Sequence, residues 1–385
     1  MTPDGLDKRG KTPGGFYRPE LDGLRFFAFF AVYIRHTFGL QMGGTHHHLP
    51  NWLGEFIGAA GIAGTFGVDL FFVLSSFLIT ELLTREIQQT GTLNIRSFYL
   101  RRMLRIWPLY FFMLAIGYAA AWIDPTEGFT WKHLLGFLLF SGNWVFMLLP
   151  VPTVAGPLWS VSLEEQFYLF WPWLVRNRSP RRLAHFALGM MCVAAVARYA
   201  MGTLQPDKDW VSENSFTRID GIAIGILLSV SLKGRIPSIT MPLRYLLAAG
   251  ALFLLLLVAT QFHLFILPVD HWRLVLGWPL AAIACGMLLL SALGAQGIMG
   301  AVLRHPVIIY LGRISFGLYA YHEIFLKIGD RLLPERASSP KQLIEYFLLG
   351  LIPTLLMSMA SYRWLEMPFL RLKKARFTVV ASRPD

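Results

Sequence analysis

The sequence has little charge and almost no cysteine. Only 15% of its 385 residues are Asp, Glu, Lys or Arg, whereas 55% are hydrophobic. The surface of a soluble domain needs more charge than this, so the composition excludes an ordinary soluble protein. The two cysteines, Cys192 and Cys285, fall in apolar runs, where we expect core residues. Two such residues form no disulfide framework and no cysteine-based zinc motif.

Acidic residues are also scarce, because 23 Asp and Glu face 35 Lys and Arg and leave a formal charge of +12. On a soluble protein this excess would favour nucleic-acid binding. Here the basic residues gather in clusters between apolar runs, which is the pattern of cytoplasmic loops in a membrane protein. We therefore expect a bilayer, and no nucleic acid, as a partner.

Long apolar runs are abundant. Residues 245–262 and 274–294 carry no charge, and at ~1.5 Å per residue each can cross a hydrocarbon core of ~30 Å. Similar runs follow along most of the chain, so we predict an all-α integral membrane protein. We expect ten transmembrane helices, at 24–40, 66–83, 106–122, 158–175, 183–201, 217–232, 245–262, 273–294, 307–326 and 344–364.

A further apolar stretch at 134–149 decides the topology. If it crossed the membrane, the basic loop at 176–182 would lie outside, against the positive-inside rule. A re-entrant or interfacial element instead leaves ten crossings, all basic loops inside and both termini cytoplasmic. Such an element needs protein or a wet cavity beside it. The predicted domains are a cytoplasmic tail at 1–16 without a signal peptide, the membrane domain at 17–370, and a basic cytoplasmic tail at 371–385.

Ionisable residues inside the spans are candidate functional residues, because each costs ~2.5–3.5 kcal/mol at mid-bilayer. In the first span, Arg25 and His36 are 11 residues apart. On an α-helix their directions differ by ~20°, and ~16 Å separates them along the axis. Arg25 would lie at the cytoplasmic boundary and His36 toward the outer half. The alternatives are a positive-inside anchor for Arg25 and a hydrogen-bonded buried histidine for His36.

Two further charged clusters begin spans. Arg102 and Arg105 are neighbours on a helix surface, and paired guanidiniums suit phosphate recognition, although they could simply anchor the helix. Glu164 and Glu165 are adjacent, so at most one of them faces an interior site. That carboxylate could orient a histidine or raise its basicity. Alternatively, both are helix N-terminal acids favoured by the helix dipole.

Other polar residues have simpler interpretations. Arg218 and Asp220 could form an interfacial ion pair, and Ser315, Tyr319 and His322, with Glu323 beside them, could make helix–helix contacts. The adjacent histidines His46, His47 and His48 lack the spacing and carboxylate support of a zinc site. We expect no metal.

Seven segments, in this order and over roughly residues 17–370, resemble the membrane acyltransferase-3 family. They are Glu20-Leu21-Asp22-Gly23-Leu24-Arg25 followed by His36, FFVLSSFLI at 71–79, RMLRIWPLY at 102–110, LWSVSLEEQFY at 158–168 with Trp159, Arg218-Ile219-Asp220 with Gly225, ISFGLYAYH at 314–322, and WLEMP at 364–368. One departure is Ser76, which stands where the family usually has glycine. That glycine could serve helix packing or a passage.

The resemblance implies an acyltransferase of the bacterial inner membrane with a ten-helix core. Its activity would be O-acylation of an extracytoplasmic carbohydrate, with acyl-CoA as the donor and acetyl as the favoured group. Arg25 and His36 would be paired functional residues, Arg102 and Arg105 would hold the phosphates of coenzyme A, and Glu164 would be the functional acid of its pair. Substrate-binding or structural candidates are Trp159, Glu165, Arg218, Asp220, Ser315, Tyr319 and His322.

The resulting hypothesis makes His36 the base that activates the acceptor hydroxyl, tuned by burial and by Glu164. Arg25, Arg102 and Arg105 would anchor the nucleotide end of acyl-CoA. Both direct transfer and transfer through an acyl-enzyme on Ser75, Ser162 or Ser315 stay open.

The alternative functions are a transporter of a glycan or acylated precursor, and a membrane glycosyltransferase or polymerase. The acceptor glycan is not identified. Because the chain ends soon after the last span, we expect no fused soluble domain.

Overall fold

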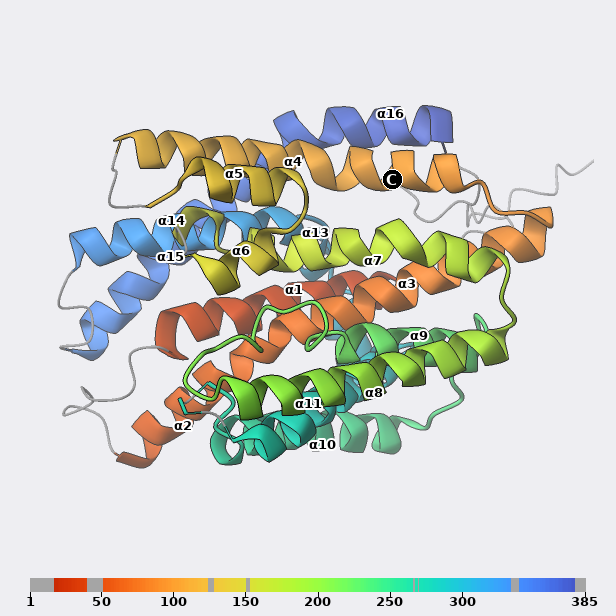
Figure 1. The fold of residues 1–385 in the computed structure, drawn as a ribbon, viewed down its shortest axis with the longest axis horizontal. Helices are drawn as coiled ribbons and strands as arrows, with labels where there is room; N and C mark the ends of the chain where they lie inside the picture. The colour runs from red at the N-terminus through yellow and green to blue at the C-terminus, as the bar shows by residue number, and fades with distance from the viewer. Residues whose placement is uncertain are drawn as a thin grey trace, which may run out of the picture.

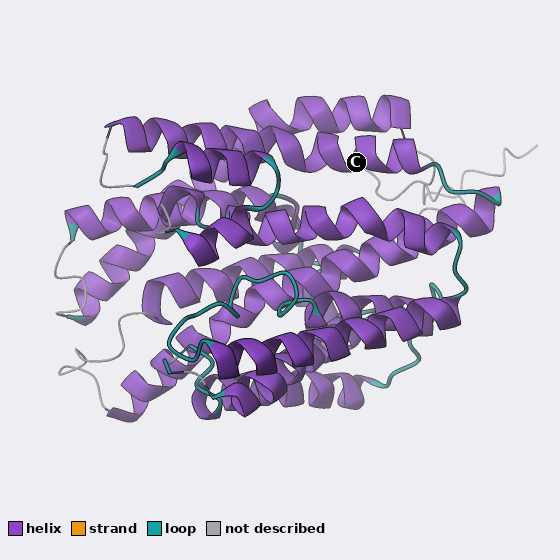
Figure 2. Cartoon of the chain, in the orientation of Figure 1, coloured by secondary structure: helices purple, strands orange, loops and turns teal. Residues whose placement is uncertain are grey.

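The computed structural model describes residues 17–39, 51–123, 128–149, 153–265, 267–268, 270–333 and 339–377. Every regular element in these ranges is helical, and the long helices run side by side along one axis (Figures 1 and 2). The prediction of an all-α protein is therefore confirmed. The helices of the first half are α1 Pro19–Ile34, α2 Asn51–Ala63, α3 Gly67–Thr90, α4 Ile95–Ile123, α5 Trp131–Leu138, α6 Gly142–Leu148, α7 Leu158–Arg176 and α8 Pro180–Leu204.

The second half continues in the same way. Its helices are α9 Asp220–Leu232, α10 Met241–Gln261, α11 His271–Ala292, α12 Gly297–Leu303, α13 Pro306–Arg313, α14 Ser315–Leu332, α15 Pro340–Ser361 and α16 Met367–Phe377. Two π-helical turns occur, η1 Arg35–Gly39 directly after α1 and η5 Tyr362–Glu366 between α15 and α16. Residues 371–377, which we predicted to begin a tail, continue α16.

Each of the ten predicted spans coincides with one of these helices or a consecutive pair. Among the described residues, six helical segments are long and apolar enough to cross a bilayer: 54–90, 95–123, 180–204, 241–261, 271–292 and 340–372. The chain is therefore a multi-pass membrane protein. α1, α7 and α14 are not among the six. They carry Arg25, Glu164 and Glu323, so hydropathy alone does not select the helices that hold these three charged residues.

The stretch at 134–149 forms two short helices, α5 and α6. At ~1.5 Å per residue neither exceeds ~12 Å, so neither can cross the hydrocarbon core. Side chains hold this hairpin against the bundle. Tyr110 Oη donates to the Phe137 carbonyl at 2.7 Å, and Gln166 Nε2 donates to the Phe140 carbonyl at 2.8 Å. The sequence did not predict α2, which packs against η1 and α10.

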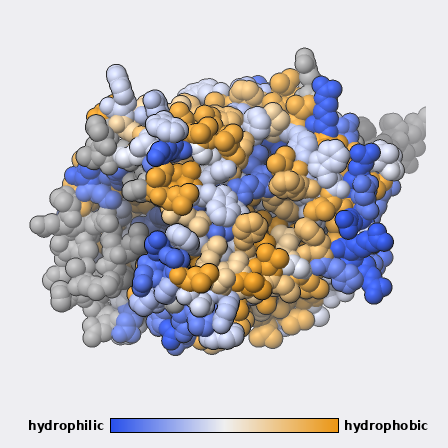
Figure 3. Space-filling model, viewed as in Figure 1, coloured by the Kyte–Doolittle hydropathy of each residue, from blue (hydrophilic) through white to orange (hydrophobic). Residues whose placement is uncertain are grey.

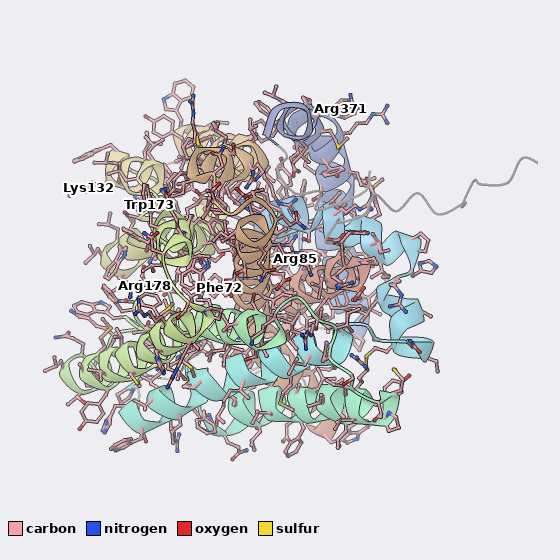
Figure 4. All side chains as sticks on the ribbon, turned by 90° about the vertical axis from the view of Figure 1, so that its right-hand side faces the viewer. Phe72, Arg85, Lys132, Trp173, Arg178 and Arg371 are labelled. Carbon is pink, nitrogen blue, oxygen red and sulfur yellow. The ribbon has the colours of Figure 1, made fainter. Side chains whose placement is uncertain are left out.

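The connections that contain basic residues or lie next to them are at one end of the bundle. The α3–α4, α7–α8 and α9–α10 connections lie at the right-hand end in Figure 1, and α4–α5, α8–α9 and α14–α15 turn at the opposite end. Hydrophilic side chains lie along that right-hand edge and also toward the left, whereas hydrophobic ones are prominent over the middle of the bundle (Figure 3). Seen from this end, Arg178 and Arg371 lie on opposite sides of the bundle (Figure 4). We call this the basic end.

The packing of α3 against α9 explains how Ser76 is accommodated. Ser76 is buried, and its hydroxyl donates to the Phe72 carbonyl at 2.7 Å. Gly225 lies opposite, and a Cβ atom there would approach Ser76 Oγ to 2.0 Å and the Val73 carbonyl oxygen to 2.4 Å. The glycine at this contact is on α9, so α3 and α9 still pack closely although α3 has a serine at position 76.

The two cysteines differ in environment. Cys285 is buried on α11, as expected, but Cys192 is exposed on α8. The core prediction for Cys192 was wrong because an apolar run in a membrane protein has a lipid-facing side as well as a core-facing side.

Candidate active site

A cavity inside the bundle collects most of the residues that the sequence singled out. Helices α1, α3, α4, α7 and α14 line it. Its walls are formed by Arg25, Val68, Phe71, Phe72, Ser75, Arg102, Arg105, Ile106, Ser160, Val161, Glu164, Tyr168, Ser315, Phe316 and Tyr319. Four motifs that are distant in sequence thus share one cavity, in addition to the FFVLSS segment of α3.

The charged side chains in the cavity wall make it cationic. Arg25, Arg102 and Arg105 contribute three guanidinium groups, and Glu164 contributes the single carboxylate of the lining. Tyr168 Oη donates to Glu164 Oε2 at 2.9 Å. The Arg102 guanidinium lies 5.7 Å from the centre of the Tyr168 ring. With three cations and one anion, the cavity is suited to an anionic ligand.

Glu165 points away from Glu164, as expected for neighbours on a helix. Glu165 is not part of the cavity lining. Its Oε2 accepts a hydrogen bond from Trp107 Nε1 on α4 at 3.2 Å. Glu165 therefore joins α7 to α4, while Glu164 faces the cavity.

His36 lies in the π-helical turn η1, next to the continuation of the cavity-lining face of α14. Its Nδ1 is 3.3 Å from Glu323 Oε1, and its ring centroid is 5.0 Å from that of His322. Ser315 and Tyr319 of α14 line the cavity, and His322 and Glu323 follow within the next turn. Tyr319 contacts both regions, because its ring also lies 5.7 Å from the His322 ring. α14 thus links the arginine cavity to His36.

The partner of His36 differs from our expectation. We expected Glu164 to tune this histidine, but the carboxylate beside it is Glu323 of α14. Glu164 lies with Arg25 in the cavity lining, of which His36 is not part. The α-helix ends at Ile34, and His36 belongs to a π-helical turn. The angle and spacing that we calculated for Arg25 and His36 on a continuous α-helix therefore do not apply. The sequence signal for Glu323 was its position directly after His322.

His322 is fully buried, and its two ring nitrogens have different surroundings. Nδ1 lies 2.7 Å from the Tyr319 carbonyl oxygen. Because a carbonyl only accepts hydrogen bonds, Nδ1 carries the proton and Nε2 keeps its lone pair. Within the described ranges, Nε2 is buried without a hydrogen-bond partner.

Arg218 and Asp220 do not pair with each other, so the interfacial ion-pair interpretation was wrong. Arg218 Nη2 binds Asp69 Oδ2 on α3 at 2.9 Å, and its guanidinium lies 3.7 Å from the centre of the Trp278 ring. Asp220 forms a buried ion pair with Arg198 of α8. The two charges therefore join α9 to separate helices. The sequence analysis missed Arg198 and Trp278, because neither lies in a recognisable motif.

The remaining candidates divide between the cavity and its supports. Ser75 and Ser315 line the cavity, whereas Ser162 does not, and its hydroxyl donates to the Leu158 carbonyl at 3.0 Å. Ser160 Oγ and Tyr319 Oη are 2.8 Å apart and connect α7 to α14. Trp159 packs its ring against Phe72 at 6.3 Å. His46, His47 and His48 lie outside the described residues.

These features define a multi-pass helical membrane protein with a cationic cavity and a histidine–carboxylate cluster inside its bundle. The chain belongs to the acyltransferase-3 family, because the model of that family, described as an acyltransferase domain, matches residues 18–363. The resemblance found in the sequence is thus confirmed over nearly the whole chain.

Two relatives from Staphylococcus aureus illustrate the similarity. A protein of strain MSSA476 with a provisional O-acetyltransferase name, SAS0844, is 24% identical over 373 residues, which cover 92% of this chain and 57% of the relative. O-acetyltransferase OatA of strain NCTC 8325 / PS 47 is 24% identical over 391 residues, which cover 96% of this chain and 59% of the relative. The chain thus spans less than two thirds of these relatives. No solved structure matches it.

Proposed function

We propose that this protein transfers an acyl group, with acetyl the favoured one, from acyl-CoA to a hydroxyl of a carbohydrate on the other side of a bacterial inner membrane. Membership of the acyltransferase-3 family and similarity to proteins named O-acetyltransferases support this reaction class. The observation that carries the proposal is the single face of α14, which lines the arginine cavity at Ser315 and Tyr319 and meets His36 at Glu323.

In this proposal, the arginine cavity binds the donor. The nucleotide end of acyl-CoA carries phosphates, and guanidinium groups bind phosphate through forked, charge-assisted hydrogen bonds. Arg25, Arg102 and Arg105 line one cavity, and Arg102 and Arg105 lie in the part of α4 that begins at the basic end. By the positive-inside rule this end is cytoplasmic, where acyl-CoA is available. The pantetheine arm would then extend along α14 toward His36.

The histidine–carboxylate pair performs the proton transfer. His36 Nδ1 lies 3.3 Å from Glu323 Oε1. With its proton on Nδ1, shared with this carboxylate, the ring would keep a lone pair on Nε2 that can take the proton of the acceptor hydroxyl. The hydroxyl oxygen attacks the thioester carbonyl, the carbon–sulfur bond breaks, and the thiolate of coenzyme A takes up the proton. The hydroxyl groups of Ser160 and Tyr319 would stabilise the negative charge on the carbonyl oxygen.

The proposal is tested by following label from radiolabelled acetyl-CoA into glycan, in membranes that contain the wild type or His36→Ala. We expect label on glycan with the wild type only. Normal labelling by a properly inserted His36→Ala variant would remove His36 from the mechanism.

A second measurement, coenzyme A binding to the purified protein, separates a wrong acceptor from a wrong class. Binding without transfer would indicate that the glycan supplied is not the acceptor. Absence of binding would favour a transporter that moves a glycan without consuming acyl-CoA.

A further inference from the structure

His36, His322 and Glu323 form a cluster of three metal-ligating side chains inside the bundle. Each offers one ligand atom, and these atoms all lie within 4.8 Å of one another. We propose that this cluster is a Zn²⁺-binding site, and that bound Zn²⁺ inhibits acyl transfer by occupying the histidine that acts as the base. The binding site stands on geometry alone, whereas the inhibition rests on the function proposed above.

The distances suit a small tetrahedral ion. Zinc binds histidine nitrogen and carboxylate oxygen at ~2.0–2.2 Å, so two ligands on a tetrahedral ion lie about 3.3 Å apart. His36 Nδ1 and Glu323 Oε1 are 3.3 Å apart. One ligand atom of His322 lies within 4.8 Å of a ligand atom on each of the other two residues, so small side-chain rotations would complete the set.

His322 is already oriented as a metal ligand. Metal-binding histidines usually donate their second ring N–H to a carbonyl or carboxylate, which fixes the tautomer and the ring. Nδ1 of His322 makes this hydrogen bond to the Tyr319 carbonyl at 2.7 Å. Nε2 then carries a lone pair in a fully buried side chain, and within the described part of the chain it has no hydrogen-bond partner. A metal ion would satisfy this otherwise costly lone pair.

The donor set favours zinc over the hard cations. Two imidazoles and one carboxylate are the ligands of catalytic zinc sites that keep a fourth position open, whereas Mg²⁺ and Ca²⁺ prefer oxygen ligands. The carboxylate of Glu323 also offsets part of the ion's charge. The side chain of His36 is 33% exposed, compared with 14% for Glu323, and His322 is fully buried, so His36 is the most accessible of the three.

Zinc binding and base catalysis exclude each other at His36. If Nδ1 coordinates the metal, the neutral ring carries its proton on Nε2. That nitrogen can then no longer accept the proton of a hydroxyl group. This proposal departs from our sequence-based expectation of no metal, which considered only histidines close together in the chain.

The experiment measures Zn²⁺ binding by equilibrium dialysis on the purified, metal-stripped 385-residue chain in detergent. His46, His47 and His48 are replaced by alanine throughout, so that they cannot contribute binding. We expect one Zn²⁺ per chain, and about tenfold or greater loss of affinity in His322→Ala and Glu323→Gln. His305→Ala and Glu345→Gln, which change exposed residues of the same types, serve as controls and should bind like the parent.

Visible absorption of the Co²⁺-loaded protein gives a second readout, because the bands report the ligand set directly. We expect the spectrum to change in Glu323→Gln and not in Glu345→Gln. Unchanged Zn²⁺ affinity and Co²⁺ spectra in monodisperse His322→Ala and Glu323→Gln proteins would overturn the site. Failure of the parent protein to bind one Zn²⁺ would overturn it as well.

Inhibition is measured separately, as acetyl transfer in membranes with Zn²⁺ and then with a chelator added. We expect transfer to fall with Zn²⁺ and to recover with the chelator. Stoichiometric binding with unchanged transfer would overturn the inhibition and leave the site established. If the metal-free wild type transfers no acetyl group, the proposed function fails, while the dialysis result still decides the metal site.

Discussion

Glu323 Oε1 lies 3.3 Å from His36 Nδ1, which brings together the first helical segment of the bundle and α14 near the other end of the chain. A carboxylate in this position holds the imidazole in one orientation and one tautomer, as in the histidine–carboxylate pairs of other acid–base catalysts. Tyr319 lines the cavity that contains the arginines, and its ring also lies 5.7 Å from the ring of His322, the residue next to Glu323.

Loss of the base or of its carboxylate should lower acyl transfer to different extents. We expect His36→Ala to reduce the rate by about 10²–10⁴-fold, the usual contribution of a general base. Glu323→Gln keeps the shape of the side chain but removes its charge, so we expect a smaller loss of the transfer rate, about tenfold or more. Initial rates of label transfer, normalised to the inserted protein, measure both. Glu345→Gln on α15 is the control, and a rate for Glu323→Gln equal to that of this control would contradict the assigned pair.

Coenzyme A affinity should depend on the arginines of the cavity and not on basic residues nearby. Arg102 and Arg105 line the cavity, whereas Arg96 on the same helix is exposed. A charge-assisted hydrogen bond contributes about 1.5–3 kcal/mol, so each single Arg→Ala change should weaken binding by about tenfold or more, and the double change should weaken it further. Calorimetric titration with coenzyme A measures this. Equal losses for Arg96→Ala and Arg102→Ala would indicate a diffuse charge effect.

The contact between Gly225 and Ser76 should limit what α9 tolerates. The Cβ of Gly225→Ala would meet Ser76 Oγ at 2.0 Å and the Val73 carbonyl oxygen at 2.4 Å. The helices must then separate, so we expect a lower unfolding temperature in detergent. Adding Ser76→Gly should recover only part of the loss, because the backbone carbonyl remains in place. Gly189→Ala, whose Cβ meets nothing within 4 Å, should not lower the unfolding temperature, because alanine is also the better helix former. Full recovery in the double variant would show that Ser76 alone restricts the position.

The buried ion pairs should be costly to break. Arg198 is fully buried, pairs with Asp220 and donates to the Thr217 carbonyl at 2.7 Å. Arg198→Ala leaves a buried carboxylate without its cation, so we expect about 3–5 kcal/mol of destabilisation. Lys341 and Glu345 form an exposed pair, and Lys341→Ala should cost less than about 1 kcal/mol. Thermal and denaturant unfolding of the purified variants checks both values. Equal effects would mean that the Arg198 pair is solvated.

Sequence alone determined the fold class and many of the residues that line the arginine cavity. Long uncharged runs can be stable only as membrane helices, because a bilayer offers no partner for exposed backbone groups. The positive-inside argument grouped the basic loops together, and in the structure their connections lie at one end. Arg25, Arg102, Arg105 and Glu164 were recognised because a charge inside an apolar segment stands out from its neighbours.

Tertiary structure decided which of these residues meet. Residue spacing places side chains relative to one another on a single helix only, and even there it fails at η1, where the π-helical turn changes the register of His36. The partner of His36 is Glu323 and not Glu164, and Arg218 pairs with Asp69 and not with Asp220. These contacts depend on how separate helices pack against one another. Packing is set by the shapes of many side chains at once, such as Gly225 against Ser76, and no local sequence pattern contains that information.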